Sequence, residues 1–389
     1  MSVDNAYKGR EQTLVKHQIL KLYIERFSLI VGSQWKTLTY VDCFSGPWKE
    51  ATEDYRDTSF AIAIEQLKKA RQYHLERGRE IGIRCMFLER SKTSYARLAA
   101  YAQQAMDENP FLEIRTLNQP LEDSIDEILS FVREAPGTFP FFFIDPTGWS
   151  GFGLKEIAPL LRLTPGEVLI NFMTSFVKRF IDHPDKVTRQ SFEDLFGNIP
   201  FNEGLATLPV QDREDALVNA YAENVKRTGH YKEVCTATVL HPTMAKTHFH
   251  LIYGTRHIRG IQKFKEVEKK AMSEMEAARA EAQQRKRESC GQLELFGSQE
   301  MHNAAHYDTL RERYLNTSKQ RLRERLMRDR RVSYDIAYVD TLKEPLIWES
   351  DLKEWVQEWR TAGCLDVLGL AEGKRVPSVE QGHTLVWKS

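Results

Sequence analysis

The sequence predicts an α/β fold in which a mainly parallel, doubly wound sheet carries helices on both faces and a smaller winged-helix-like domain follows. Three observations support this prediction. Strand and helix patterns alternate through roughly the first 250 residues, which is typical of βαβ units. Residues 139–144 are apolar on both faces, as expected of a central parallel strand. Near the C-terminus, a helical pattern precedes two short strand patterns, which is a winged-helix order.

Composition limits the class of protein. The chain has 389 residues, 41% of them hydrophobic and 28% charged, which is ordinary for a folded protein with a sizeable core. Its 55 basic and 55 acidic residues give no net charge, so any basic surface has to be local. The longest apolar stretch is too short for a membrane span and the N-terminus has no apolar leader, so we expect a cytoplasmic location. The five cysteines include no Cys-x-x-Cys pair, so we expect neither a disulfide framework nor a metal site.

The first half of the chain begins with a predicted helix over residues 13–31, where apolar residues recur at three- and four-residue spacings. Gly32 ends it, and a strand over 38–41 runs into a turn at Asp42. Thr58 can cap the next helix. Continued alternation predicts strands over 81–88, 112–117, 139–144 and 167–172, and helices over 58–75, 91–106, 121–134 and 153–162.

The second half begins with helical patterns near 188–196 and 212–228 and a strand pair near 234–240 and 248–253. Residues 263–288 contain few large apolar side chains, so we expect a solvated helix or a mobile connector there. A helix after residue 346 and strands near 364–368 and 384–387 form the winged-helix-like pattern. These features predict a sheet domain over 1–262, a charged helical linker over 263–302, and a basic helix with the winged-helix-like domain over 303–389.

Candidate site residues follow the predicted strands, because open parallel sheets bind ligands at the carboxyl ends of their strands. Asp42 begins a turn in which Gly46 lets a ligand approach the backbone. Glu89 follows the second strand and can bind ribose hydroxyls. Asp145 follows the most apolar strand, where an acid is costly to bury without a partner. Such acids can also simply cap the next helix. The absence of a Gly-x-Gly-x-x-Gly turn disfavours a nicotinamide enzyme.

Four segments of the chain resemble the three-Cys-motif partner protein (TcmP) family. They are Lys16-His17-x-Ile19-Leu20-x-x-Tyr23, Tyr40-Val41-Asp42-Cys43-Phe44-Ser45-Gly46-Pro47, Phe143-Ile144-Asp145-Pro146-Thr147-Gly148 and Glu167-Val168-Leu169-Ile170-Asn171-Phe172. The resemblance covers residues 14–265. It implies a Rossmann-like, class I methyltransferase-type domain, in a family whose gene neighbour is often a three-Cys-motif, radical-SAM-like protein.

A broader resemblance, to S-adenosylmethionine-dependent methyltransferases, implies a cofactor and roles for the strand-end residues. The first turn would hold the methionine and ribose portions of S-adenosylmethionine. The acid after the second strand would bind the ribose hydroxyls, and the segment after the third strand would contact the adenine. The cofactor-binding residues implied are Asp42, Phe44, Ser45, Gly46, Glu89 and Asn118.

The Asp145-Pro146 element resembles the loop that holds the target amine in enzymes that methylate exocyclic base nitrogens. The Asp145 side chain and the Pro146 carbonyl can both accept hydrogen bonds from an amino group. Positions 147 and 148 are Thr and Gly, which leaves Trp149 as the candidate aromatic that stacks on the base. Asp145, Pro146 and Trp149 are therefore the predicted catalytic residues.

A local positive charge suggests the substrate. Residues 311–331 carry nine Lys or Arg against three acids, a net charge of +6. Basic side chains gain affinity for a phosphate backbone by releasing counterions. The predicted contacts are Arg321, Arg323, Arg325 and Arg328.

Two functions follow from these observations. The first is a methyltransferase that modifies an exocyclic base nitrogen of RNA or DNA, with a three-Cys-motif, radical-SAM-like protein as the candidate partner. The alternative is a non-catalytic nucleotide-binding adaptor that recruits a partner protein to nucleic acid.

Overall fold

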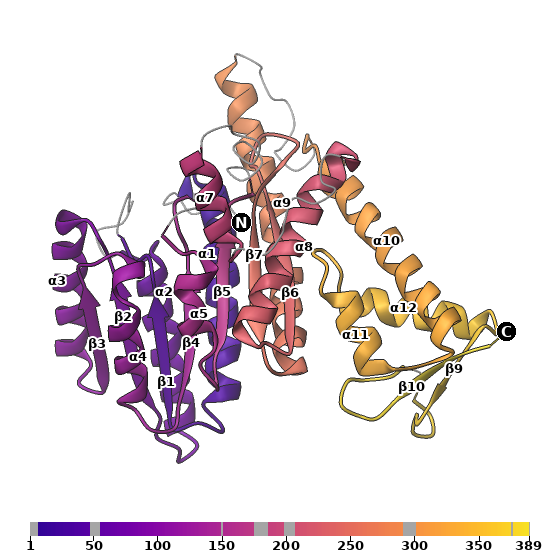
Figure 1. Cartoon of the computed structure of the whole chain (residues 1–389), viewed down its shortest axis with the longest axis horizontal. Coiled ribbons are helices and arrows are strands. Elements are labelled where there is room, and N and C mark those ends of the chain that lie inside the picture. The colour runs from indigo at the N-terminus through magenta and orange to yellow at the C-terminus, as the bar shows by residue number, and fades with distance from the viewer. Residues whose placement is uncertain are drawn as a thin grey trace.

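A computed structural model describes residues 7–46, 55–148, 151–174, 186–197, 207–290, 301–374 and 376–388. They form a large lobe built on a seven-stranded sheet and a smaller C-terminal lobe with a three-stranded sheet (Figure 1). Within these ranges, no helix has both the length and the apolar character that crossing a membrane requires.

The large sheet has the strand order β3-β2-β1-β4-β5-β7-β6. The first five strands run parallel, β7 is antiparallel to β5, and β6 is antiparallel to β7. The strands are β1 Thr37–Asp42, β2 Gly82–Leu88, β3 Leu112–Leu117, β4 Thr138–Ile144, β5 Glu167–Phe172, β6 Glu233–Leu240 and β7 Thr247–Thr255. After β3 the chain returns to the far side of β1, so the strand order reverses between β1 and β4. The predicted fold class is confirmed.

Helices cover both faces of this sheet. One face carries α1, α2, α3 and α9, and the other carries α4, α5, α7 and α8; each group buries its apolar side chains in a cluster of its own. Their bounds are α1 Glu11–Val31, α2 Ser59–Leu75, α3 Lys92–Glu108, α4 Ile125–Arg133, α5 Leu154–Leu161, α7 Lys186–Leu195, α8 Val210–Gly229 and α9 Ile258–Ser289. The Thr58 hydroxyl caps α2 as predicted, accepting a hydrogen bond from the amide of Ala61.

The helix predicted over 121–134 is shorter than expected. Residues Leu121–Asp123 form a 3₁₀ turn, and α4 begins only at Ile125. The Ser124 hydroxyl donates to the carbonyl of Pro120 at 2.8 Å. A serine that bonds the preceding backbone competes with the helical pattern, which explains the later start.

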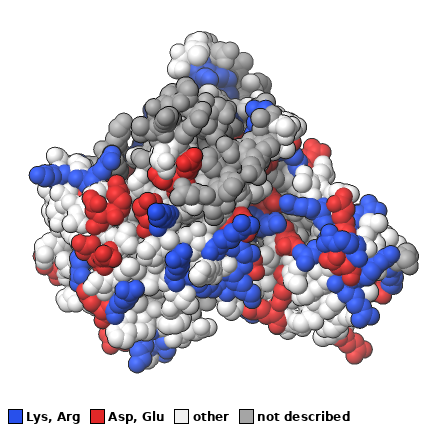
Figure 2. Space-filling model, in the orientation of Figure 1, with Lys and Arg blue, Asp and Glu red and all other residues white. Residues whose placement is uncertain are grey.

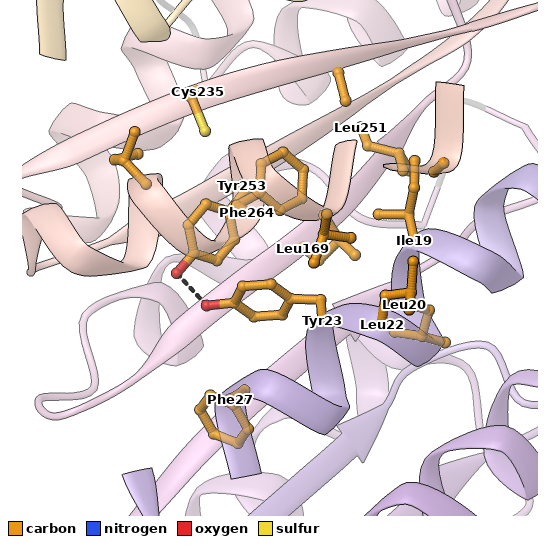
Figure 3. Packing of buried hydrophobic residues seen from close by; sticks show 14 of the residues in the cluster. Ile19, Leu20, Leu22, Tyr23, Phe27, Leu169, Cys235, Leu251, Tyr253 and Phe264 are labelled. Atoms are coloured by element: carbon orange, nitrogen blue, oxygen red, sulfur yellow. Dashed lines mark hydrogen bonds between the residues drawn. The ribbon is translucent and has the colours of Figure 1, made fainter. Parts of the chain in front are cut away.

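Aromatic side chains bind α1 and α9 to the sheet (Figure 3). Tyr23 of α1 packs against Tyr253 of β7 with ring centroids 5.0 Å apart, and Tyr253 stacks on Phe264 of α9 at 4.7 Å. The Tyr23 hydroxyl donates to Glu167 at 2.7 Å. A buried polar group needs such a partner, so this contact fixes how α1 lies on the sheet.

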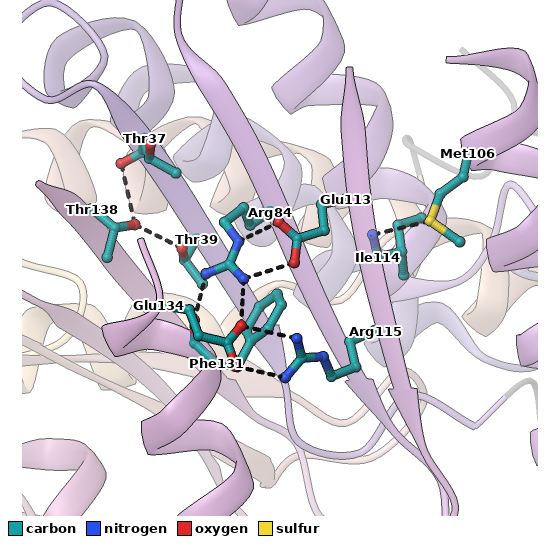
Figure 4. A network of polar contacts seen from close by, with 10 residues as sticks. All are labelled: Thr37, Thr39, Arg84, Met106, Glu113, Ile114, Arg115, Phe131, Glu134 and Thr138. Carbon is teal, nitrogen blue, oxygen red and sulfur yellow. Dashed lines mark hydrogen bonds and ion pairs between the residues drawn. The ribbon is translucent and has the colours of Figure 1, made fainter. Parts of the chain in front are cut away.

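Charged side chains protect the exposed edge of the sheet at β3 (Figure 4). Arg84 of β2 forms two hydrogen bonds, of 2.6 and 2.7 Å, with Glu113 of β3. Glu134 accepts from Arg84 at 3.0 Å and pairs with Arg115 at 2.9 Å. Charges on an edge strand oppose pairing with other chains.

The expectation that residues 263–288 are solvated is wrong. These residues belong to α9, which packs along α1 and also touches β6, β7 and the C-terminal lobe. Apolar residues along its length, from Ile261 to Met275, are buried. Even Lys265 and Glu268 are buried, with 1% and 0% of their side chains exposed, and they form an ion pair of 2.5 Å. The helix is therefore a structural layer between the two lobes.

The C-terminal lobe combines a long helix, two shorter helices and a hairpin. Its elements are α10 Ala305–Asp329, β8 Arg331–Ser333, α11 Tyr334–Leu342, α12 Glu349–Thr361, β9 Leu365–Leu368 and β10 Thr384–Trp387. The small sheet has the order β8-β10-β9 and is antiparallel. The predicted helix and hairpin are confirmed. Trp355 and Trp359 of α12 are buried in the core of this lobe.

Candidate functional site

Two adjacent cavities lie where the strand order reverses. The larger has a volume of about 580 Å³ and the smaller about 180 Å³. Phe44, Pro146 and Thr147 line both. Both cavities are therefore bounded by the loops after β1 and β4, where a doubly wound sheet is expected to bind its ligand.

The turn after β1 is held by Asp42. Its carboxylate accepts hydrogen bonds from the amide of Phe44 at 3.1 Å and the hydroxyl of Ser59 at 2.6 Å. The Ser45 hydroxyl donates to the Asp42 carbonyl at 2.8 Å. Burial raises the pKa of Asp42 to about 6, although these hydrogen bonds oppose the shift. Asp42 and Ser45 thus lie behind the turn, while Phe44 and Gly46 line the larger cavity.

Glu89 lies in the wall of the smaller cavity. It is 4% exposed, and its Oε1 accepts from the amide of Ser91 at 2.6 Å. Among the described residues, none bonds its Oε2. A carboxylate oxygen that lines a cavity and has no described protein partner is suited to bind the hydroxyls of a ligand.

Asn118 follows β3, as predicted, but it is not among the residues that line either cavity. Its side-chain amide donates to the carbonyls of Glu89, at 2.8 Å, and Arg90, at 3.2 Å. It therefore holds the loop after β2, and the neighbouring residues Gln119 and Leu121 line the smaller cavity in its place.

Asp145 lies between two polar partners in the larger cavity. Lys16 of α1 binds its Oδ2 at 2.5 Å, and the side-chain amide of Asn171, at the end of β5, donates to its Oδ1 at 2.7 Å. Asn171 is 2% exposed, and its own Oδ1 has no described hydrogen-bond partner. The cavity thus presents a paired carboxylate, while the unpartnered Asn171 Oδ1 is buried behind its wall. Trp149 lies outside the described residues.

Sequence reasoning gave Lys16, Asn171 and the histidines of this cavity no role in the site. Asn171 follows the same strand-end rule as Asp145, applied to β5, and could have been found by it. Lys16 reaches Asp145 from 129 residues away, and its helical pattern contains no signal for that contact. No group of three or more His, Cys, Asp or Glu that could hold a metal ion occurs in the described ranges.

The four arginines predicted to bind nucleic acid lie on α10, and three of them have acidic partners. Arg321 pairs with Glu344 at 2.7 Å, Arg325 with Asp340, and Arg328 with Asp329 at 2.8 Å. Arg323 is exposed and has no described partner. Figure 2 shows basic and acidic side chains next to one another on the visible face of the C-terminal lobe. Asp329 is already counted in the local charge of +6, but Asp340 and Glu344, together with Asp351 and Glu358, compensate part of it from outside the run.

No protein-family model matches the chain. No curated protein matches it either. Among solved structures, it is similar to a Legionella pneumophila protein of the DUF519 family (12% identity, TM-score 0.38, 67% of this chain and 92% of the other). It is also similar to a Bacillus cereus O-methyltransferase solved with SAH (13% identity, TM-score 0.32, 60% of this chain and 80% of the other). A third similar structure is that of the O-methyltransferase TomG of Streptomyces achromogenes, solved with SAM (12% identity, TM-score 0.33, 66% of this chain and 92% of the other). Likenesses this distant assign no activity.

Proposed function

We propose that the chain is an S-adenosylmethionine-dependent methyltransferase whose acceptor is an exocyclic amine of a nucleic-acid base. The observation that carries the proposal is the pair of cavities at the reversal of strand order, one containing the free oxygen of Glu89 and the other containing Asp145. S-adenosylmethionine supplies an electrophilic methyl group, so the protein needs only to position the acceptor.

The residues present fit this cofactor. Glu89 Oε2 would accept hydrogen bonds from the ribose hydroxyls in the smaller cavity, and Phe44 and Gly46 would contact the portion that extends into the larger one. Asp42 would not contact the cofactor itself. It would position Phe44, because its carboxylate accepts a hydrogen bond from the Phe44 amide.

The acceptor amine would be held by two groups in the larger cavity. Asp145, fixed by Lys16 and Asn171, would accept one N–H, and the Pro146 carbonyl would accept the other. Two accepted hydrogen bonds turn the nitrogen lone pair towards the methyl group. As the new C–N bond forms, the bond between the methyl group and the cofactor sulfur would break, leaving S-adenosylhomocysteine, and Asp145 would receive the proton that the acceptor nitrogen loses.

Replacing Glu89 with alanine should weaken S-adenosylmethionine binding at least tenfold, because a hydrogen bond to a charged group contributes about 1.5–3 kcal/mol. Isothermal calorimetry measures the affinity. Glu127→Ala, an exposed glutamate of α4, is the matched control and should bind as the wild type does. Unchanged affinity in a folded Glu89→Ala variant would remove Glu89 from the site, and no binding by the wild type would reject the cofactor.

We further propose that the C-terminal lobe is winged-helix-like and holds the polynucleotide. Its free cations include Arg323, Arg330 and Arg331, which are exposed and have no described acidic partner. The exposed face of α12, in contrast, carries Glu354, and its Glu358 is paired with Lys319. Repulsion between Glu354 and phosphate favours contact through the end of α10 and β8.

Changing Arg323, Arg330 and Arg331 together to glutamine should weaken nucleic-acid binding and flatten its salt dependence. Each lost phosphate contact lowers the slope of log K against log salt by about 0.9 for a duplex. Binding measured by fluorescence anisotropy at several salt concentrations gives this slope. A control triple on exposed positions of the large lobe is Lys21, Lys92 and Arg133 to glutamine. If both triples keep the wild-type slope, this surface does not bind the polymer.

The resemblance of residues 14–265 to the three-Cys-motif partner protein family supports a further part of the proposal, that a radical-SAM-like protein is the partner. Transfer assays should therefore be run with and without such a partner. The adaptor alternative corresponds to binding of the cofactor and nucleic acid without methyl transfer in either assay.

A further inference from the structure

One wall of the larger cavity is basic. It is built from Arg10 just before α1, Lys16 of α1, His241 and Lys246 of the connection between β6 and β7, and His248 of β7. This wall shares the cavity with Asp145 and Asn171.

The acids of the cavity leave this wall with an excess positive charge. Asp57 is engaged by Arg10 at 2.5 Å, and Asp145 by Lys16 at the same distance. Lys246 is exposed, and no described acid pairs with it. Three cations therefore face two carboxylates, and Lys246 is the one whose charge remains available to a ligand.

The hairpin places two imidazole rings beside Lys246. The backbone amide of His241 donates to the carbonyl of Lys246 at 2.9 Å, and the rings of His241 and His248 lie 5.6 Å apart. His241 Nδ1 accepts from the amide of Thr243 at 3.2 Å. In the neutral ring the proton is then on Nε2, which is left as a hydrogen-bond donor.

Burial, and after it the neighbouring cations, disfavour protonation of these two rings. Burial lowers the pKa of His248 to about 4, and His241, Lys246 and Lys16 add to the effect. The pKa of His241 is lowered by burial and by Lys246, Lys286 and Arg279. Glu11 opposes the shift of His241, but it is itself paired with Arg285.

We propose that this wall binds a phosphate group of the methyl acceptor, through the Lys246 ammonium and the His241 and His248 rings. Lysine binds phosphate as a point charge, and a neutral imidazole N–H adds a donor. The inference rests on the proposed methyl transfer and narrows its substrate. Because the phosphate site and Asp145 share one cavity, the acceptor is a nucleotide unit with its phosphate attached, in a strand or free, rather than a base or nucleoside.

The test uses the full chain and inorganic phosphate as the probe. Phosphate binding should raise the pKa of His248 and His241, because a nearby anion favours the charged ring, and NMR of the ring protons follows both. Lys246→Gln should weaken phosphate binding about tenfold or more, as expected for loss of a charge-assisted hydrogen bond. Lys92→Gln, an exposed lysine of α3, is the matched control.

Transfer assays separate this inference from the proposed function. Lys246→Gln should raise KM for a phosphorylated acceptor with little change in kcat, since the contact is made equally in the ground and transition states. Comparing a mononucleotide with a short oligonucleotide distinguishes the two sources of phosphate. If S-adenosylmethionine binds but phosphate binding is absent or independent of Lys246, the phosphate site is rejected and the methyltransferase proposal remains. If phosphate binds as described but S-adenosylmethionine does not, the methyltransferase proposal is rejected and the phosphate site remains.

Discussion

Replacing Asp145 with alanine should reduce methyl transfer by at least about a hundredfold, the lower range for loss of a positioned acid–base group, while S-adenosylmethionine affinity stays nearly unchanged. The carboxylate lies in the larger cavity and would act on the acceptor, so its interaction matters mainly in the transition state. Asp145→Asn should retain part of the activity, since an amide oxygen can still accept one hydrogen bond. Single-turnover transfer of labelled methyl groups, combined with calorimetry, measures both quantities.

The control for this prediction is Asp126→Ala, at an exposed position of α4. Loss of cofactor affinity together with activity would show that Asp145 shapes the cofactor site. If Asp145→Ala alone unfolds, the acid has a structural role as the partner of Lys16 and Asn171. If the wild type binds the cofactor but transfers no methyl group to RNA or DNA, with or without its proposed partner, the adaptor alternative is correct.

The largest expected change in stability concerns the buried ion pair of α9. Lys265 donates to the carbonyls of Thr236 in β6, at 3.3 Å, and Glu344 after α11, at 2.7 Å, in addition to its contact with Glu268. Glu268 in turn accepts from the amide of Leu346 at 3.0 Å. The pair therefore connects the sheet to the C-terminal lobe through buried polar contacts.

Lys265→Met should lower the free energy of unfolding by about 3–5 kcal/mol, because it leaves Glu268 buried without its cation. Urea denaturation measures this loss. Lys263→Met is a control on the same helix: its pair with Glu266 has the same i,i+3 spacing but is partly exposed, and its loss should cost under about 1 kcal/mol. A second variant, Lys265→Met with Glu268→Leu, should recover part of the stability.

The stability that Lys265→Met loses should also depend on pH. Burial raises the pKa of Glu268, and Lys265 is a main opposing influence, so removing it raises that pKa further. A carboxyl group with a raised pKa in the folded state stabilises most at low pH, and this contribution is lost as pH rises through the folded value. The deficit should therefore be greater at pH 8 than at pH 5. A deficit that is the same at both, or similar to that of Lys263→Met, would contradict the assigned role of the pair.

The sequence by itself determined the parallel part of the sheet and the strand ends that carry the candidate site. Strands apolar on both faces, alternating with helical patterns, allow few arrangements other than a doubly wound sheet. The positions of Asp42, Glu89 and Asp145 follow from this, because parallel strands end at the same edge and their register aligns these ends. Patterns within short segments were sufficient to predict the position of a residue wherever that position depends only on its own strand and the adjacent strand.

Only the tertiary structure decided which polar groups pair over long separations. The contact between Lys16 and Asp145 and the burial of α9 both depend on segments far apart in the chain. The same is true of the basic run over 311–331, whose charge is partly neutralised by Asp340, Glu344, Asp351 and Glu358 from outside the run. A charge count over a short window cannot include such partners, because electrostatic interactions depend on distance in space and on burial rather than on position in the sequence.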